Sequence, residues 1–117
     1  MTELESAILK ELQSRRGPAN AITASVLAKL VGTDERHVRE IIHDLRVEQG
    51  YGEIIGGTGS GDGVGYWWAE TVEQLERARH KLASRIDKMG QVMGAYWQAR
   101  ERMTKPPAEQ ANLFSGN

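Results

Sequence analysis

Hydrophobic residues recur every three or four positions through the first fifty residues, the spacing that gathers them on one face of a helix. The pattern predicts three helices, at about residues 3–15, 24–31 and 34–49. Each is preceded by a residue whose side chain can accept a hydrogen bond from the first helical turn. These N-cap residues are Thr2, Thr23 and Asp34. Thr2 also forms a capping box with Glu5.

The second and third of these helices are separated by only two residues, Gly32 and Thr33. Two helices joined by a tight turn that contains glycine are typical of the helix-turn-helix motif. The first helix, in contrast, is followed by Gly17 and Pro18, which end it because proline cannot continue a helix.

The spacing changes after residue 50. Residues 51–55 and 65–69 are rich in aromatic and β-branched residues and are predicted to be short strands. Eight of the thirteen glycines lie from Gly50 to Gly65, so the connection is expected to be a flexible hairpin tip. Because neighbouring residues of a strand point to opposite faces, the side chains of Trp67 and Trp68 are expected to lie on opposite faces of the strand. We expect one in the core and the other partly exposed, packed against the helix that follows.

Thr71 and Gln74 form another capping box, and apolar residues then recur at intervals of seven. This predicts a helix of about 33 residues, about 50 Å long. Over residues 71–103 the helix is expected to pack against the domain or to dimerise, although arginines interrupt its apolar face. Residues 104–117, which include Pro106 and Pro107, are expected to form a flexible tail. The residues spaced by seven are Leu75, Leu82, Met89, Tyr96 and Met103.

The order of a helix, a helix-turn-helix pair and a hairpin over residues 1–70 resembles the winged helix-turn-helix family of bacteria and their phages. The expected fold class is therefore mostly α with a small β-hairpin, followed by a long C-terminal helix and a tail. The resemblance implies that the third helix enters the major groove of double-stranded DNA. The residues that carry it are Ile22-Thr23-Ala24, Leu27-Ala28-Lys29-Leu30-Val31-Gly32, Val38-Arg39-Glu40-Ile41-Ile42-His43-Asp44-Leu45-Arg46 and Gly65-Tyr66-Trp67-Trp68.

At 100° per residue, the apolar and the polar residues of the third helix lie on opposite sides. By the resemblance, Arg36 would bond a guanine bidentately, and Arg39 and Arg46 would reach a base or a phosphate. His43 would contact a phosphate or be an ordinary surface residue. The candidate DNA-binding residues are Arg36, Arg39, Glu40, His43 and Arg46.

The charge is distributed unevenly, although the whole chain carries only −1. Residues 1–70 hold seven Lys and Arg against eleven Asp and Glu, and residues 54–68 hold no basic residue, unlike wings that contact DNA. The alternative for the third helix is therefore a solvated face of mixed charge. Residues 71–105 hold eight basic against four acidic residues, so this helix offers either a solvated, salt-bridged surface or a phosphate-facing edge. That edge would comprise Arg77, Lys81, Arg85 and Lys88.

The sequence Gln110-Ala111-Asn112-Leu113-Phe114 resembles the short motif by which bacterial polymerases and repair factors dock on the sliding clamp. By this resemblance, Gln110 makes polar contacts at the rim of the clamp pocket, and Leu113 and Phe114 enter it as apolar anchors. Ala111 and Asn112 depart from the residues most frequent in the motif. A short tail with two adjacent anchors suits modest-affinity docking. The alternative is a tail that folds back and buries Phe114 in the domain.

Composition limits the remaining possibilities. The 117 residues, 39% hydrophobic and 26% charged, suit one compact soluble domain. The absence of cysteine excludes disulfides, Cys-ligated metals and thiol nucleophiles, and suits the cytoplasm. No apolar run approaches the ~20 residues of a membrane span. We expect no metal, no cofactor and no catalysis, because His37, His43 and His80 lack metal-site spacing and the glycines match no nucleotide-binding loop.

Together, the two resemblances imply a phage or bacterial replication-associated protein that docks on the DNA sliding clamp and contacts DNA through the helix at 34–49. Two alternatives remain. The protein could be a dimeric winged-helix transcriptional regulator whose tail motif is accidental, or an inhibitor that occupies the clamp of host replication without binding DNA.

Overall fold

A computed structural model describes residues 1–57 and 64–105. The described chain is mostly helical, with one antiparallel hairpin and a long C-terminal helix, which confirms the expected fold class. It divides into two compact units, the first ending at Ala78 and the second beginning at Arg79. The expected hairpin tip and the expected tail both fall largely outside the described residues. The elements are α1 Glu3–Ser14, the short 3₁₀ helix η1 Pro18–Asn20, α2 Ala24–Val31, α3 Glu35–Val47, β1 Ile54–Gly57, β2 Gly65–Trp68 and α4 Val72–Thr104.

The predicted helix starts are confirmed by their hydrogen bonds. The hydroxyl of Thr2 accepts from the Glu5 amide at 3.1 Å, and the hydroxyl of Thr23 accepts from the Val26 amide at 3.2 Å. At the start of α4, the Thr71 hydroxyl accepts from the Gln74 amide at 3.2 Å, while the Gln74 side-chain oxygen accepts from the Thr71 amide at 3.4 Å. These short-range bonds satisfy amides that have no partner within their own helix.

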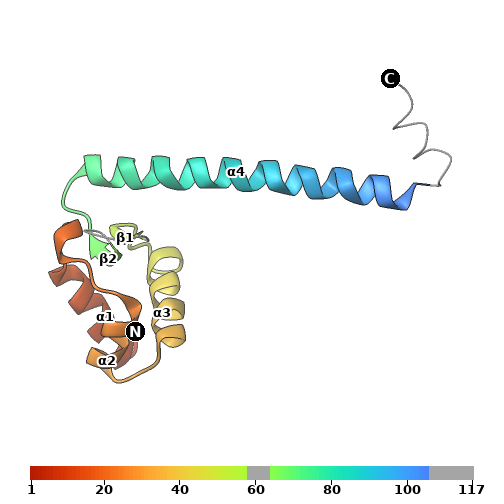
Figure 1. Cartoon of the computed structure of the whole chain (residues 1–117). Coiled ribbons are helices and arrows are strands. Elements are labelled where there is room, and N and C mark those ends of the chain that lie inside the picture. Colours follow the sequence, from red (N-terminus) through yellow and green to blue (C-terminus); the bar gives the residue numbers. More distant parts are fainter. Residues whose placement is uncertain (58–63, 106–117) are drawn as a thin grey trace. The chain divides into compact units, whose positions relative to one another are not determined.

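The first unit is built from α1, α2 and α3, which pack against one another beside the hairpin (Figure 1). Their apolar faces form one core, which also includes Ile54 of β1 and Trp68 of β2. The largest side chains that are completely buried there are Ile8, Leu12, Leu27, Val38, Ile42, Leu45 and Ile54. Burial of these faces provides the main favourable contribution to folding.

The hairpin begins later than predicted. Residues 51–53, expected to be the start of a strand, belong instead to a turn in which the Tyr51 amide donates to the Leu45 carbonyl at 2.9 Å. Gly50, with φ of 79°, directs the chain back toward α3 at this point. β1 therefore starts at Ile54, which pairs with Trp68 in an antiparallel register that continues to Gly57 and Gly65.

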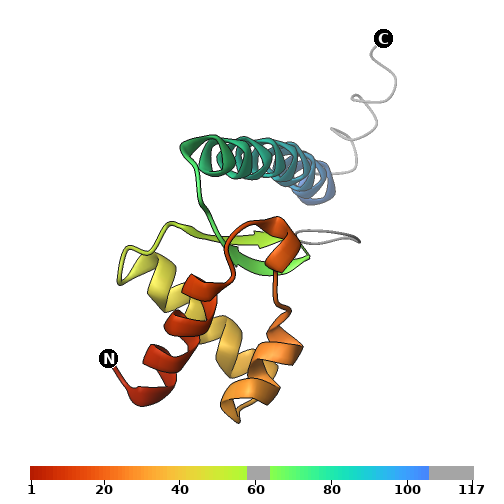
Figure 2. The same ribbon diagram turned by 90° about the vertical axis from the view of Figure 1, so that its left-hand side faces the viewer.

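A feature that the sequence analysis did not predict is a second neighbour for β2, on the edge away from β1 (Figure 2). Ile22 and Tyr66 exchange two backbone hydrogen bonds, of 2.8 and 2.7 Å. Further along, the Trp68 amide donates to the Arg15 carbonyl at 2.7 Å, and the Gly17 amide donates to the Trp68 carbonyl at 3.0 Å. The segment between α1 and α2 thus fastens the hairpin to the helices.

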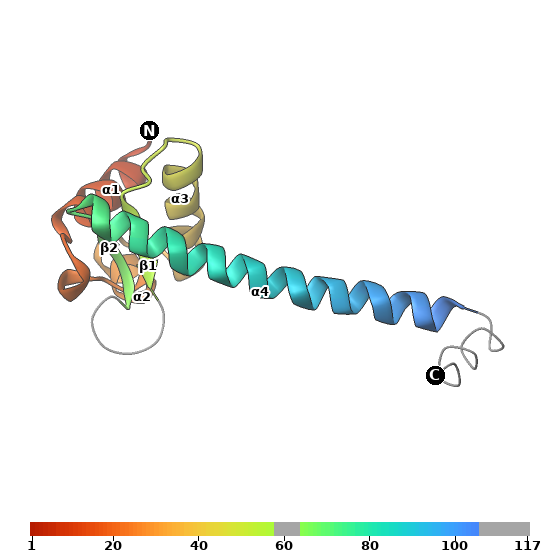
Figure 3. The same ribbon diagram turned by 90° about the horizontal axis from the view of Figure 1, so that it is seen from above.

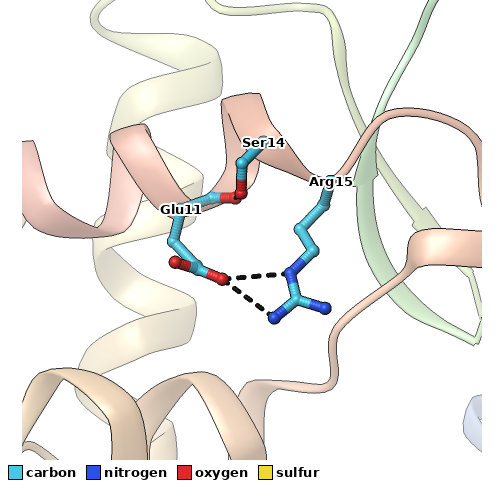
Figure 4. Close-up of polar contacts among 3 residues, drawn as sticks. All are labelled: Glu11, Ser14 and Arg15. Carbon is cyan, nitrogen blue, oxygen red and sulfur yellow. Dashed lines mark hydrogen bonds and ion pairs between the residues drawn. The ribbon is translucent and has the colours of Figure 1, made fainter.

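Arg15 is held in place by the last turn of α1 (Figure 4). Its Nε and Nη2 atoms donate to one carboxylate oxygen of Glu11, at 3.0 and 2.9 Å. Both side chains are about one-third exposed, at 33%. The Ser14 hydroxyl donates to the Glu11 carbonyl at 2.6 Å in the same turn. This contact orients the end of α1, where the Arg15 carbonyl receives the Trp68 amide.

The two tryptophans lie on opposite faces of β2, as predicted, but the expectation that one is partly exposed is wrong. Each retains only 8% of its accessible surface. Trp68 packs in the main core, with its ring centroid 6.1 Å from that of Tyr51. Trp67 is covered on the other face by Leu75 and Ala78, because the first turns of α4 pack there.

α4 is one unbroken helix of 33 residues (Figure 3). Its first turns belong to the first unit, and from residue 79 onward the helix belongs to the second. In the second unit most of its large apolar side chains are exposed: Leu82, Ile86, Met89, Val92, Met93, Tyr96, Trp97 and Met103.

Candidate nucleic-acid interface

The exposed side of α3 is the candidate DNA-binding surface. The helix starts at the Asp34 cap, whose carboxylate accepts from the His37 amide at 2.8 Å. Gly32 precedes it in the left-handed conformation, with φ of 77° and ψ of 40°, so only three residues separate the end of α2 from the start of α3. The apolar side of α3 is buried in the core: Val38, Ile41, Ile42 and Leu45. That burial fixes which side chains face outward.

Four of the five predicted DNA-binding residues lie together on this outward face. These four residues are Arg36, Arg39, Glu40 and His43, and they line one shallow, open depression. The side chain of Asp44 also lines it. All of them are exposed. Asp44 was not among the predicted site residues, although its position four residues after Glu40 on the same helix could have indicated it.

Arg46, the fifth predicted residue, reaches a different part of the unit. A Cβ atom built on Gly56 of β1 would lie 3.8 Å from Nη1 of Arg46 and 3.3 Å from Cε1 of Tyr66. The Arg46 guanidinium therefore lies beside the hairpin, apart from the depression on α3.

Two ion pairs partly neutralise the arginines of the α3 surface. Arg36 Nε lies 3.4 Å from a Glu40 carboxylate oxygen, and Arg39 Nη2 lies 3.3 Å from a Glu35 carboxylate oxygen. The Arg36 side chain is 90% exposed, so its pair is highly solvated. Exposed pairs four residues apart on a helix contribute only about 0.3–0.5 kcal/mol. Either arginine can therefore exchange its carboxylate for a phosphate or a base edge with little loss of stability.

The electrostatic character of the depression is balanced rather than basic. Its lining combines two guanidinium groups and one imidazole with the carboxylates of Glu40 and Asp44. His37, near the start of α3, is turned toward the preceding turn, with its Nδ1 atom 3.1 Å from the Thr33 hydroxyl. A phosphate backbone that approaches α3 would meet both signs of charge, which limits the affinity that this surface alone can provide.

Other site types receive no support from the described ranges. Within residues 1–57 and 64–105, no three or more His, Asp or Glu side chains are grouped so that they could hold a metal ion. In the same part of the chain, no helix has both the length and the apolar character needed to cross a membrane. The three residues expected to bind the sliding clamp, Gln110, Leu113 and Phe114, lie outside the described residues.

No protein-family model matches the chain, and no curated protein or solved structure is significantly similar to it. The features of the chain that bear on its function are therefore the α3 surface, the exposed face of α4 and the C-terminal sequence.

Proposed function

We propose that the protein is a winged-helix protein associated with DNA replication, which docks on the bacterial sliding clamp and contacts double-stranded DNA through α3. The observation that carries the proposal is the outward face of α3, where Arg36, Arg39 and His43 are exposed together directly after a helix-turn-helix turn. Helices placed in this way commonly enter the major groove, and arginine is the residue that most often bonds guanine there.

The balanced charge of this surface is the reason to join DNA contact to clamp docking. A domain with a net charge of −4 over residues 1–70 has little of the phosphate attraction that supports non-specific binding. A tether changes this, because it raises the effective concentration of the second contact to the order of millimolar. The sequence Gln110-Ala111-Asn112-Leu113-Phe114 supplies a candidate tether, with Leu113 and Phe114 as anchors.

Titration of the full chain into a fluorescently labelled bacterial sliding clamp tests the docking half of the proposal. We expect saturable binding in the micromolar range. Leu113→Ala/Phe114→Ala should weaken it more than a hundredfold, because each buried anchor contributes about 1.5–3 kcal/mol. Ser115→Ala/Asn117→Ala, two truncations in the same tail, is the matched control and should bind as the original chain does. Absence of binding by the original chain would refute clamp docking.

Binding to double-stranded DNA over a range of salt concentrations tests the α3 half. Arg36→Gln/Arg39→Gln should weaken binding and lower the slope of log K against log salt by about one to two, since each lost phosphate contact removes about 0.9. Lys10→Gln/Arg16→Gln removes the same charge from the α1 region and should have the smaller effect. Equal effects of the two variants would refute a specific role for α3. Clamp binding without any DNA binding would instead select a protein that occupies the clamp and hinders replication.

A second candidate function, a dimeric winged-helix transcriptional regulator, is favoured by the exposed apolar residues of α4. Such a regulator would bind a palindromic DNA site as a dimer, with one copy on each half-site. It would show no saturable binding to the clamp. The two titrations above therefore separate the candidates.

A further inference from the structure

In the second unit, α4 exposes large apolar side chains at a spacing that alternates between four and three residues from Leu82 to Tyr96; Arg100 then occupies the core position before Met103. This is the spacing of the core positions of a coiled coil. The side chains are between 49% and 81% exposed. We call this strip the apolar seam; it consists of Leu82, Ile86, Met89, Met93, Tyr96 and Met103.

The same seven-residue repeat begins earlier, where the first unit covers it. Leu75 and Ala78 are partly buried against Trp67 and its neighbours. From Leu82 onward, the seam side chains are exposed within the part of the chain that the structure describes. An exposed apolar strip of this length on a helix marks an interaction surface.

The flanks of the seam suit a second helix rather than water. The flanking positions on one side are Ala83, Gly90 and Trp97, and those on the other are Arg85, Val92 and Ala99. Most of them are uncharged, and the small residues among them allow another backbone to approach closely. Residues 89–99 contain no charged side chain. A helix surrounded by water normally carries charged residues in a stretch of this length. The surface that matches the strip in length and spacing is the same strip on a second copy.

Charge decides the relative direction of the two helices. In a parallel pair in register, the core positions of Arg79 and Arg100 would each face the same arginine of the other copy, and like charges repel. In an antiparallel pair that places Leu82 opposite Met93, Arg79 faces Tyr96 and Arg100 faces Leu75 of the other copy, so neither core arginine faces an arginine. An arginine over an aromatic ring is favourable. Within one chain, the Arg100 guanidinium already lies 5.5 Å from the ring centroid of Trp97.

We propose that two copies of this chain associate through the apolar seam as an antiparallel two-stranded coiled coil. Leu82 of one copy faces Met93 of the other, and Ile86 faces Met89. The association does not depend on what α3 and the C-terminal sequence bind. The experiments below therefore test it separately from the proposed function.

Disulfide cross-linking tests the direction, because the chain has no cysteine of its own. Leu82→Cys and Met93→Cys are prepared as separate full-length proteins, reduced, mixed in equal amounts, oxidised and resolved by intact mass. The antiparallel pair predicts that the mixed disulfide between the two variants dominates, since only facing core positions come within the Cα separation of about 4–7 Å that a disulfide needs. Predominant disulfides between identical variants would establish a parallel pair and overturn the proposal.

Sedimentation velocity of the full chain, from about 1 to 200 µM, tests the seam itself. The original chain should change from monomer to dimer over this range. Ile86→Glu/Met89→Glu should remain monomeric at every concentration. Ser84→Glu/Gln91→Glu adds the same charge to the opposite face of α4 and should dimerise as the original chain does. A chain that stays monomeric, or two variants that behave alike, would overturn the assignment of the seam.

Discussion

Gly65, the first residue of β2, is the position where the fold depends most sharply on the absence of a side chain. Its φ of 98° is one that side-chain-bearing residues rarely adopt. A Cβ atom there would lie 2.4 Å from the Ile22 carbonyl oxygen and 2.8 Å from the Thr23 amide nitrogen. Both are backbone atoms at the start of α2, so neither can move aside as a flexible side chain would. We therefore expect Gly65→Ala to destabilise the first unit strongly.

Two contributions determine the size of this effect. The positive φ alone costs alanine about 1–2 kcal/mol. Relief of the clash moves Ile22 away from β2 and weakens the two hydrogen bonds that Ile22 and Tyr66 exchange, each worth about 0.5–1.5 kcal/mol. Together they predict a loss of about 2–5 kcal/mol in the free energy of unfolding, a large fraction of the stability of a typical small domain.

Urea unfolding followed by tryptophan fluorescence measures this loss. A Trp97→Phe background confines the signal to Trp67 and Trp68, which both lie on β2 and report on the first unit. The midpoint should fall while the slope with urea stays constant, because the surface exposed on unfolding does not change.

Two other glycines separate the contributions. Gly32 has φ of 77° but no atom within 4 Å of its added Cβ, so Gly32→Ala should lose only the conformational part, about 1–2 kcal/mol. Gly52 has open space and no positive φ, so Gly52→Ala should be neutral or slightly stabilising. If Gly65→Ala loses no more than Gly32→Ala does, the close approach of the Ile22 backbone, just before α2, is not what requires glycine.

Three further substitutions test other contacts by the same unfolding measurement. Asp34→Ala removes the N-cap of α3 and should cost about 1 kcal/mol, whereas Asp34→Asn should retain most of the stability; equal losses would exclude capping as the cause. Glu11→Gln weakens the contact with Arg15 and should cost less than about 1 kcal/mol, with a difference that shrinks as salt is added; a loss that ignores salt would contradict an electrostatic cause. Leu75→Ala uncovers Trp67 and should cost about 1–2 kcal/mol, below the range for fully buried leucines because Leu75 is only partly buried, with a red shift of the native fluorescence. An unchanged spectrum would show that α4 does not cover Trp67 in solution.

The parts of the fold that were predictable from the sequence are those governed by neighbouring residues. Caps at Thr2, Thr23 and Asp34 act within four residues, and the helical repeat determines which side of α3 is buried. The pairing of Ile22 with Tyr66 was missed because a bridge of one residue leaves no repeat in the sequence. The start of β1 was misplaced because a hydrogen bond back to α3, not strand propensity, positions Tyr51.

The candidate site shows the same limit. Four of the candidate residues on α3 lie together because helical geometry alone places them on one face. Arg46 was included through the resemblance, and its position seven residues after Arg39 agrees with that side of the helix, but its side chain lies next to Gly56, a contact that arises only when the hairpin packs on α3. The burial of Trp67 likewise depends on the tertiary packing of Leu75 and Ala78.

The composition of α4 beyond residue 79 gives an independent reason to expect a partner for the apolar seam. Gly90 and Gly94 lie in the middle of the helix, where each glycine costs about 1 kcal/mol relative to alanine. Isolated helices gain little stability in water, and most helices depend on the burial of an apolar face. Here the apolar face is exposed in a single chain, so helix formation and burial of the seam are coupled. Association of a second copy would therefore increase the helix content of residues 79–104 as the protein concentration rises, since a partner that binds only the helical form stabilises it by mass action. Ile86→Glu/Met89→Glu, which cannot bury the seam, should show a helix content that does not change with concentration, and circular dichroism measures the difference directly.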